Sequence, residues 1–476
     1  MKNIFILACV CAAACHAAPT SEQTSGNKTS TPPLQTLNIT HAGSAKPVVG
    51  TELEATAEGL PPGRKVDVLW KTVSGGWVIE DYFHFRGKKF SETSQTIAQA
   101  ETDDNGRLST HFTIPEDYGG VHEIVVADHG TPIAQGGVEV SQTFEMHPTE
   151  GPVGTPVDVR VHGLGWRTME STWVINWDNQ EVGWVSATGT RGAATARFRA
   201  SGNAGLHQVR VYSGYMGQSY LNHEQAPNAY LPRPAFTFRV TPGNAATAAY
   251  AEPYVKQPVP QADKALASAG VAPAQGPVRT RAVLKASGLP PNASVSLVWG
   301  TWEGSRVSGN GFAPKDTELT TLQTRTDGTL DAPLDVPDDL GGLHTISVRS
   351  GDRTLARTYF VIETSVVSIS PKSGPAGTPV TIHLKGVGWT DYDNIYIATY
   401  DNSYMGYACG FNSRGDVVIN FTAAGAPGVH LIDLYPGIYQ GPEGQQQLYR
   451  LPQLTYADDH PGNKIPALRF AFEVTR

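Results

Sequence analysis

Four histidines stand two residues after a glycine, and imidazole is a side chain that can bind metal ions or transfer protons near neutral pH. They are His122, His207, His344 and His430. Each opens its own strand-like segment, so we expect one such histidine in each of four modules along the chain. Single histidines in separate modules cannot converge on one ion. We therefore predict that all four are structural, with metal binding as the alternative.

Carboxylates form the second group of residues that could do chemistry. Adjacent acids occur at Glu116-Asp117 and at Asp338-Asp339, in both cases after a proline and before glycines. Neighbours in a turn cannot flank a substrate from opposite sides, so we predict solvated turns here and not an acid–base pair. Asp103-Asp104-Asn105-Gly106 could supply oxygens to calcium, but the related Asp327-Gly328 has lost most of them. A turn is again the prediction.

The motifs of common enzyme classes are missing from the sequence. His122-Glu123 and His223-Glu224 lack the second histidine four residues further on that a zincin helix requires. The chain contains no G-x-S-x-G elbow, no glycine-rich phosphate loop and, after the N-terminal segment, no C-x-x-C pair. We therefore predict a protein that is not an enzyme and that uses no cofactor and no metal.

An internal duplication provides the elements that position these residues. Gly151–Trp166, GPVGTPVDVRVHGLGW, returns as Gly374–Trp389, GPAGTPVTIHLKGVGW, with nine of sixteen positions identical. The offset of 223 residues (374 minus 151) is too long for a solenoid or propeller repeat and marks a domain-sized unit, type B. A second repeated unit, type A, precedes each copy and is marked by Gly59-Leu60-Pro61-Pro62 and Gly288-Leu289-Pro290-Pro291.

Alternating side chains predict strands throughout both units. Val157, Val159 and Val161 alternate with polar residues, as in a strand with one buried face. Turn signals are regular and no long helical period occurs in the modules. The predicted fold class is all-β, with four tandem immunoglobulin-like β-sandwiches in an A-B-A-B duplication. The predicted boundaries are a signal peptide at 1–17, a Ser/Thr/Pro-rich tether at 18–47, A1 at 48–142, B1 at 143–242, an Ala/Pro-rich linker at 243–275, A2 at 276–365 and B2 at 366–476.

The N-terminal segment predicts export. Lys2 precedes an apolar stretch at residues 4–14, and Cys15-His16-Ala17 resembles a cleavage site. Cys15 is also the candidate for a lipid anchor, because the residues before it distantly resemble a lipoprotein box. We expect the periplasm, the outer-membrane surface or the extracellular space. No later apolar run is long enough for a transmembrane segment, and Cys409, the remaining cysteine, excludes an internal disulfide framework.

The net charge of the chain limits the classes of partner that we expect. The chain has 476 residues, a formal net charge of −8 and no basic stripe, which argues against nucleic acid and anionic membrane surfaces. A protein or glycan partner at the cell surface is the remaining expectation.

The second copy resembles a known family at its start. Ser368 to Ile382, SISPKSGPAGTPVTI, followed by Gly386-Val387-Gly388-Trp389, is similar to the opening of IPT/TIG immunoglobulin-like domains. The resemblance covers about a fifth of each B module, and Trp stands where the family usually has Phe. It implies a sandwich used for adhesion, spacing or ligand binding, and no catalysis. The Gly-x-His position likewise resembles the corner tyrosine of immunoglobulin-like domains, whose ring bonds nearby backbone.

Candidate binding residues lie in parts of the B modules that a plain sandwich would not need. Long connections, about 213–234 and 436–466, separate the histidine strand from the last strand and are rich in tyrosine, which suits protein or sugar surfaces. A role in covering the open end of the sandwich is the alternative. Two Asp-Asn pairs after an aromatic residue are further candidates, with a turn as the alternative. The predicted ligand-binding residues are Asp178, Asn179, Tyr215, Tyr220, Tyr230, Asp401, Asn402, Tyr439, Tyr449 and Tyr456.

Two functions follow from these observations. The first is an exported, non-enzymatic tandem immunoglobulin-like protein that acts as a cell-envelope or extracellular interaction or adhesion module. The alternative is a set of carbohydrate-binding modules that use the tyrosine-rich loops or an aromatic strand. That strand would need Trp173 and Trp177, and their counterparts Tyr396 and Tyr400, in an exposed row; alternation favours a core position instead.

Overall fold

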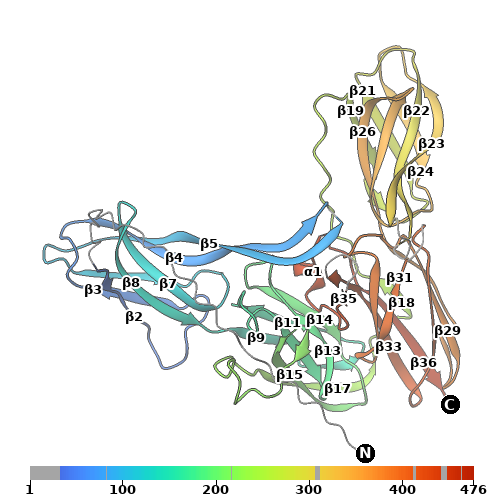
Figure 1. Cartoon of the computed structure of the whole chain (residues 1–476). Coiled ribbons are helices and arrows are strands. Elements are labelled where there is room, and N and C mark those ends of the chain that lie inside the picture. Colours follow the sequence, from blue (N-terminus) through green and yellow to red (C-terminus); the bar gives the residue numbers. More distant parts are fainter. Residues whose placement is uncertain are drawn as a thin grey trace, which may run out of the picture.

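A computed structural model describes residues 33–81, 83–215, 217–305, 311–410, 414–440, 447–462 and 464–476. The predicted signal peptide, the candidate lipid site Cys15 and the tether up to residue 32 lie outside these residues. The described chain is almost entirely β-structure, with one short helix, α1 (Tyr456–Asp459). The all-β prediction is confirmed: separate sheets stack as multi-domain sandwiches (Figure 1). No helix in the described ranges is long and apolar enough to cross a membrane.

The first sandwich, A1, encloses a core around Trp70, which is fully buried. Leu37 lies in that core, between two short strands that fall inside the predicted tether. The tether prediction was therefore too long, because residues 35–40 already pair with the sandwich. The larger A1 sheet has the order β1 (Gln35–Thr36), β8 (Thr131–Val140), β7 (Gly120–Asp128), β4 (Lys65–Glu80), β5 (His84–Glu101), and the smaller sheet has the order β2 (Asn38–Thr40), β3 (Glu52–Ala57), β6 (Leu108–Thr113).

The A2 sandwich repeats the strand order of A1 around Trp299, which occupies the position of Trp70. Its larger sheet has the order β20 (Gln275–Gly276), β26 (Arg353–Ile362), β25 (Gly342–Ser350), β22 (Ser294–Gly304), β23 (Phe312–Gln323), and the smaller sheet has the order β19 (Ser268–Ala272), β21 (Arg281–Ser287), β24 (Leu330–Asp335).

In the B1 sandwich the repeated segment forms two strands joined by a tight turn. Val157, Val159 and Val161 are buried, as their alternation predicts, and pack on Trp173 and Trp177. The larger sheet has the order β10 (Glu150–Val153), β17 (Ala235–Asn244), β15 (Gly205–Tyr215), β12 (Trp173–Trp177), β13 (Gln180–Val185), with β16 (Gln218–Ser219) beside β15, and the smaller sheet has the order β14 (Ala194–Arg199), β11 (Pro156–His162), β9 (Thr143–His147).

The two sheets of the B2 sandwich have the same plan, with one strand added to the larger sheet. β18 (Ala249–Ala251) pairs with its last strand, although residues 249–251 were predicted to be linker. The linker prediction was wrong there and at residues 268–272, which form β19 of A2. The larger B2 sheet has the order β18, β36 (Leu468–Thr475), β33 (Gly428–Gly437), β30 (Ile395–Tyr400), β31 (Ser403–Cys409), with β28 (Ser373–Pro375) beside β36; the smaller sheet has the order β27 (Ser365–Ser370), β29 (Pro379–Lys385), β32 (Val417–Thr422); and β34 (Tyr439–Gln440) pairs with β35 (Gln447–Leu448). The A-B-A-B duplication as such stays a prediction from the sequence.

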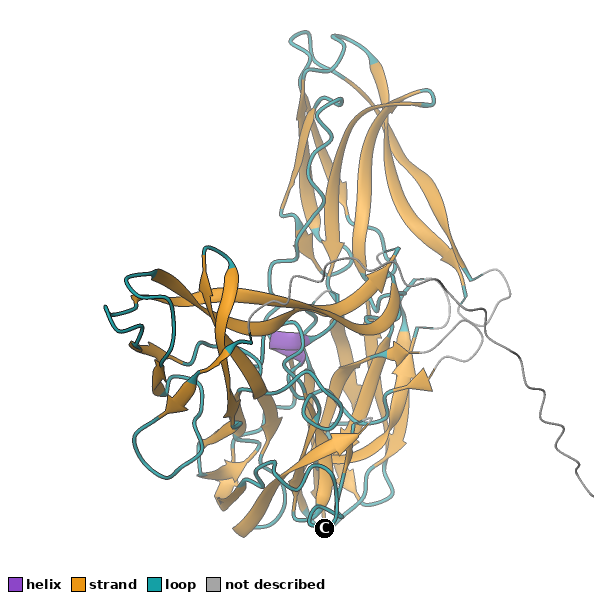
Figure 2. Cartoon of the chain, turned by 60° about the vertical axis from the view of Figure 1, so that its left-hand side comes forward, coloured by secondary structure: helices purple, strands orange, loops and turns teal. Residues whose placement is uncertain are grey.

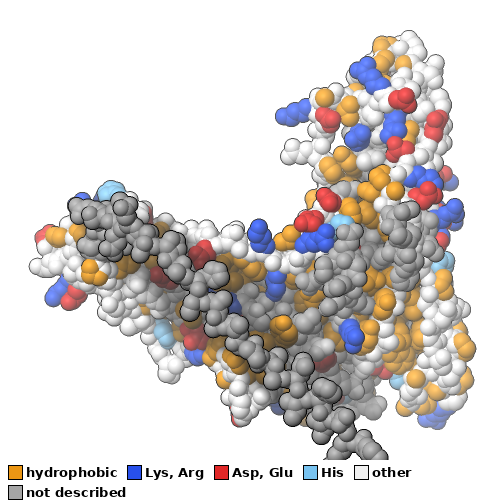
Figure 3. All heavy atoms as spheres, in the orientation of Figure 1, with side chains coloured by type: hydrophobic (Ala, Val, Ile, Leu, Met, Phe, Trp, Pro, Cys, Tyr) orange, Lys and Arg blue, Asp and Glu red, His pale blue; other side chains and the backbone are white. Residues whose placement is uncertain are grey.

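One hairpin of A1 contacts both the A2 and the B2 sandwich. Strands β4 and β5 leave A1 as a long ribbon that passes over α1 toward the B2 sandwich (Figures 1 and 2). At its tip the ring of Phe83 lies 5.1 Å from that of Trp389 in B2 and 6.2 Å from that of Trp302 in A2. The Asp391 amide donates to the Phe83 carbonyl at 3.0 Å. Three sandwiches therefore meet at this tip. On the face drawn in Figure 3, positive and negative groups are interspersed.

Candidate functional site

The four Gly-x-His histidines contact the backbone of the preceding turn. In each module Nε2 lies at hydrogen-bond distance from the carbonyl oxygen four residues upstream, and the ring stacks on an aromatic side chain of the neighbouring strand. The carbonyl contacts are His122–Tyr118 at 2.7 Å, and His207–Asn203, His344–Leu340 and His430–Ala426 at 2.8 Å. The stacked partners are Trp70, Trp177, Trp299 and Tyr400 respectively. Among the described residues no three His, Cys, Asp or Glu side chains come together as a metal site.

The second ring nitrogen distinguishes the two module types. In A modules it faces a carbonyl oxygen, and burial lowers the pKa of His122 and His344. In B modules it faces a carboxylate, Asp178 at 2.5 Å from His207 and Asp401 at 2.6 Å from His430. Burial acts to lower the pKa of His430, but its hydrogen bonds to the Ala426 carbonyl and Asp401 outweigh burial and raise it.

The two Asp-Asn pairs form the tight turns that join the last two strands of the larger B sheets, β12 to β13 and β30 to β31. Both residues of each pair have positive φ, 49° and 65° for Asp178-Asn179 and 49° and 67° for Asp401-Asn402, as in a type I′ hairpin turn. Asp178 and Asn179 are exposed. Asn402 is instead buried and donates to the Arg199 carbonyl at 2.8 Å, so the B2 turn contacts B1.

Two carboxylates that we predicted in solvated turns are buried. Asp117 accepts a hydrogen bond of 3.0 Å from the Trp70 indole, and Asp339 accepts one of 2.9 Å from the Trp299 indole. Asp117 is 1% exposed and Asp339 9%. The prediction of a solvated turn was wrong for these two acids, because each satisfies the N–H of a core tryptophan.

The two tyrosine-rich connections differ in what they contact. In B1, Tyr215 and Tyr230 are 57% and 45% exposed, and Tyr220 is half-buried. In B2, Tyr439 and Tyr456 are buried and Tyr449 is half-buried. Burial raises the pKa of Tyr449 to about 12. The tyrosines of the B2 connection therefore lie against protein, whereas Tyr215 and Tyr230 of the B1 connection are open to solvent.

The protein surface that covers the B2 connection belongs to B1. We call residues 449–459 the clasp. Its backbone lies along the edge strand β13: the Trp184 amide donates to the Pro452 carbonyl at 2.8 Å, and the Leu454 amide donates to the Trp184 carbonyl at 2.7 Å. On the opposite sheet the Arg197 amide donates to the Leu454 carbonyl at 2.9 Å. The clasp thus closes the side of the B1 sandwich between its two sheets. It also covers the main chain of the edge strand β13, which would otherwise be unpaired.

Clasp side chains complete the B1 core. Leu454 and Tyr456 are fully buried among B1 residues such as Val182 and Phe198, together with Tyr435 from B2. The Trp184 indole donates to the Leu451 carbonyl at 3.0 Å and its ring stacks on Tyr449. B1 therefore lacks part of its core without B2.

The clasp ends in Asp459, whose carboxylate accepts hydrogen bonds from two other sandwiches. Asp459 accepts hydrogen bonds from the Ser186 hydroxyl at 2.6 Å, the Thr188 amide at 2.8 Å and the Gly189 amide at 2.5 Å, all in B1. The Trp77 indole, from the A1 hairpin, donates at 3.1 Å. Burial raises the pKa of Asp459 to about 6, although these hydrogen bonds favour the ionised form.

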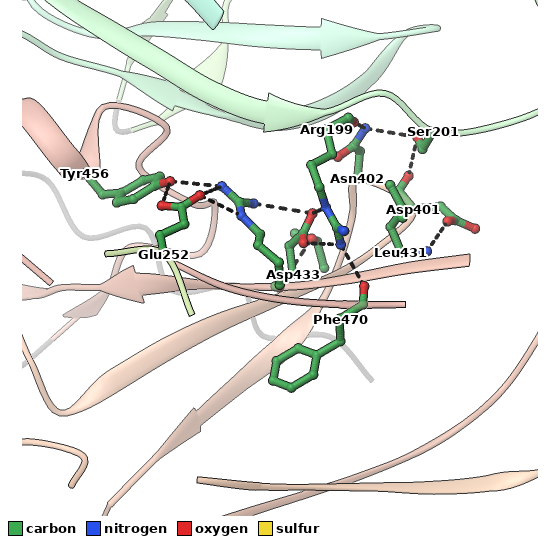
Figure 4. Close-up of polar contacts among 11 residues, drawn as sticks. Arg199, Ser201, Glu252, Asp401, Asn402, Leu431, Asp433, Tyr456 and Phe470 are labelled. Carbon is green, nitrogen blue, oxygen red and sulfur yellow. Dashed lines mark hydrogen bonds and ion pairs between the residues drawn. The ribbon is translucent and has the colours of Figure 1, made fainter. Parts of the chain in front are cut away.

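A buried ion network joins B1 to B2 beside the clasp (Figure 4). Asp433 lies 2.5 Å from the Arg199 guanidinium of B1 and 3.4 Å from that of Arg469. Arg469 also pairs with Glu252, which follows β18, at 2.9 Å, and Tyr456 bonds to Glu252. Asp433, Arg199 and Arg469 are at most 2% exposed. Two cations and two anions therefore balance inside the interface, as buried charges require.

The linker also lies against protein. Between residues 257–260 and the A2 sheet there is a cavity of about 720 Å³. Its lining is mainly apolar, with Trp302, Tyr359 and Val361 of A2 and Tyr392 of B2. The size and lining are those of small-ligand pockets.

Comparison with known proteins gives only distant structural matches. No protein-family model and no curated protein sequence matches the chain. Among solved structures it is similar to Escherichia coli alpha-2-macroglobulin activated by porcine elastase (11% identity, TM-score 0.17), covering 93% of this chain and 44% of that chain. It is also similar to a tetra-tandem repeat in the extending region of a large adhesion protein (11% identity, TM-score 0.18, 93% and 100% covered) and to the human OSCAR ligand-binding domain (12% identity, TM-score 0.14, 47% and 98% covered). The IPT/TIG resemblance stays a prediction.

The clasp and the ion network are the main features that our sequence predictions missed. Asp433 carried a usable signal, because a carboxylate inside the apolar run Leu431 to Tyr435 needs a buried partner. The clasp carried little signal, since Leu451-Pro452-Gln453-Leu454 has neither helical nor strand periodicity.

Proposed function

We propose that this chain is an exported, non-enzymatic interaction protein of the cell envelope or extracellular space, built as one interlocked body. The insertion of the B2 clasp into the B1 core is the observation that carries this proposal. A chain of loosely linked domains needs no such contact, whereas a scaffold that must present surfaces at a fixed spacing gains from it. The hairpin tip and the ion network also connect the sandwiches and so help to fix their spacing.

The partners of the polar side chains favour a non-enzymatic role. The corner histidines contact backbone carbonyls, Asp117 and Asp339 accept from tryptophan indoles, and Asp459 accepts from four donors. Each of these groups already has a structural partner. A catalytic base instead needs an open position within hydrogen-bond reach of a substrate.

The carbohydrate alternative is weakened because the aromatic strand is not exposed as a binding surface. Trp173 and Tyr396 are fully buried and Trp177 is 5% exposed, so these rings cannot line up as a sugar platform. Of the tyrosines predicted to bind a ligand, Tyr215 and Tyr230 of the B1 connection are the exposed ones that a glycan could contact.

Affinity capture from the intact cell envelope with the tagged full-length chain tests the proposal. We expect recovery of a protein partner whose capture survives removal of glycans from the lysate and is unchanged in a Tyr215→Ala/Tyr230→Ala variant. Capture that requires glycans and is lost in this variant would support the carbohydrate function instead. Turnover of a substrate by the full-length chain would overturn the non-enzymatic part.

A further inference from the structure

The two B sandwiches have equivalent edge strands, of which only one is covered. β31 follows β13 at the offset of 223 residues that relates the two copies, so Tyr407 stands where Trp184 stands in B1. Trp184 is 2% exposed beneath the clasp, whereas Tyr407 is 48% exposed. Both strands end their sheets, and over the described residues β31 pairs with β30 alone. The main chain of Tyr407 therefore faces outward in the same way as that of Trp184.

A glycine repeated in both strands points to close approach of another backbone. A Cβ at Gly183 would lie 2.5 Å from the Pro452 carbonyl oxygen, so the clasp can approach only because this residue has no side chain. Gly406, its counterpart, has nothing within 4 Å of the equivalent Cβ position and no positive φ. Gly183 and Gly406 both directly follow the residue at which the pairing register with the neighbouring strand shifts, and nothing in the described chain lies near the Cβ position of Gly406.

The exposed side chains of β31 from Tyr404 to Tyr407 are apolar or aromatic, while Ser403 at its start donates to Gln180 of β13 at 2.5 Å. Tyr404 and Met405 are 40% and 37% exposed, and Val418 on the facing edge strand β32 is 57% exposed. In B1 the counterpart of Val418 is Thr195, whose amide donates to Asp458 of the clasp at 2.7 Å. We call Tyr404–Tyr407 and Val418 the B2 slot. It corresponds to the groove that the clasp fills in B1.

We propose that the B2 slot binds an extended segment of a partner protein with the chemistry of the clasp, an aromatic residue ahead of a Leu-Pro-x-Leu sequence. The segment adds a parallel strand to β31, as the clasp does at the bridge between Trp184 and Gln453. The Tyr407 amide donates to the carbonyl of the proline, the Tyr407 carbonyl accepts from the second leucine, and the aromatic residue stacks on the Tyr407 ring. This inference rests on the proposed function and names the partner chemistry for it.

A partner fits this slot better than a second copy of the chain. The clasp of any copy is already buried in its own B1 core. The B1 connection is held on its own sandwich, because Leu231 is buried there and the Val211 amide donates to the Pro234 carbonyl at 3.0 Å. Neither segment is available to another molecule without unfolding part of its own module.

The probe for a binding test is the capped peptide Tyr-Arg-Leu-Pro-Gln-Leu-Thr-Tyr, the sequence of Tyr449–Tyr456, with a photo-crosslinker in place of its first tyrosine. Titrated into the full-length chain, it should bind saturably and crosslink to β31. The Gly406→Ala variant should bind at least about tenfold more weakly, a loss of ~1.4 kcal/mol, because the added methyl group meets the incoming carbonyl. A peptide with an N-methyl group at its second leucine should show a similar loss.

Gly270→Ala is the matched control. Gly270 also lies on an edge strand, β19, with nothing within 4 Å of its Cβ position, so this variant should bind the peptide like the wild type. Equal melting temperatures for both variants and the wild type show that the fold is intact. The inference is overturned by absent binding, by binding that Gly406→Ala leaves unchanged, or by crosslinks to Trp184 in B1.

Two further outcomes are decisive. Dimerisation of the chain that Gly406→Ala abolishes would make a second copy the occupant and would also overturn the partner proposal. Envelope capture with Gly406→Ala separates this inference from the proposed function. Loss of the captured protein supports both, whereas unchanged capture leaves the proposed function standing and refutes the slot.

Discussion

The ion network between B1 and B2 allows a sharp test of the interlocked architecture through Asp433→Ala. Asp433 is fully buried and is the carboxylate partner of Arg199, which otherwise donates only to the Phe470 carbonyl within the network. Removal of the carboxylate leaves the Arg199 guanidinium buried without an anion. Breaking a buried pair on one side typically costs ~3–5 kcal/mol.

A second substitution separates this charge effect from lost packing. Arg199→Met combined with Asp433→Ala removes both ions and keeps the Arg469–Glu252 pair, so the double variant should be more stable than Asp433→Ala alone. Glu139→Ala, which breaks the exposed pair with Lys46, is the control and should cost less than ~1 kcal/mol.

Urea unfolding followed by tryptophan fluorescence measures these differences, because Trp184 is buried under the clasp and becomes exposed when the interface opens. The B1–B2 transition should move to lower urea in Asp433→Ala and recover in the double variant. A cost below ~1 kcal/mol for Asp433→Ala, or a double variant less stable than the single one, would refute a desolvated network as the contact that holds the halves together.

Three other predictions follow. Gly183→Ala places a methyl group 2.5 Å from a clasp carbonyl, so it should destabilise the chain by ~1–3 kcal/mol and speed proteolysis within residues 449–459; unchanged cleavage would contradict the clasp contact. His207→Tyr should be tolerated better than His207→Ala if the ring acts as a corner, and equal losses of melting temperature would contradict that role. Asp459 holds its proton more tightly when folded, because burial raises its pKa from an ordinary value of 3.8 to about 6. Its protonation therefore stabilises the fold near pH 4, and this contribution, ~3 kcal/mol at most, is lost as pH rises through 6. Asp459→Asn should flatten that part of the unfolding free energy against pH, and an unchanged pH profile would exclude Asp459 as its source.

Elements whose signals are local were predictable from the sequence. The valines of β11 alternate with polar residues, and one face of the strand is buried accordingly. The corner histidines were predictable in position because the glycine two residues earlier and the turn before it lie within a few residues of the ring. Tight turns at Asp178-Asn179 and Asp401-Asn402 were open as an alternative for the same reason, since both residue types accept positive φ.

Contacts between modules were not predictable in this way. The Trp184 indole and its acceptor, the Leu451 carbonyl, are 267 residues apart in sequence, and the contact uses main-chain groups that every residue carries. The tyrosines of the B2 connection were predicted to bind a ligand, whereas Tyr439 and Tyr456 are buried against the chain itself. Composition alone could not distinguish a surface that binds a partner from one that binds the same chain, because both need aromatic rings and few charges.

The two B copies differ at positions that contact the clasp in B1 and have no clasp to contact in B2. Ser186 in B1 donates to Asp459 of the clasp, and its counterpart at the offset of 223 residues is Cys409, whose thiol is a much weaker donor. The position of Trp184, beneath the clasp, holds Tyr407 in B2, where the ring is half exposed and its hydroxyl can reach water. Positions 183 and 406, in contrast, both hold glycine. Both glycines follow a register shift in their strand pairing, which by itself favours a glycine there. Gly406 in addition lies on an open, aromatic edge with nothing in the described chain near its Cβ position, which leaves room in B2 for a second backbone from outside the chain.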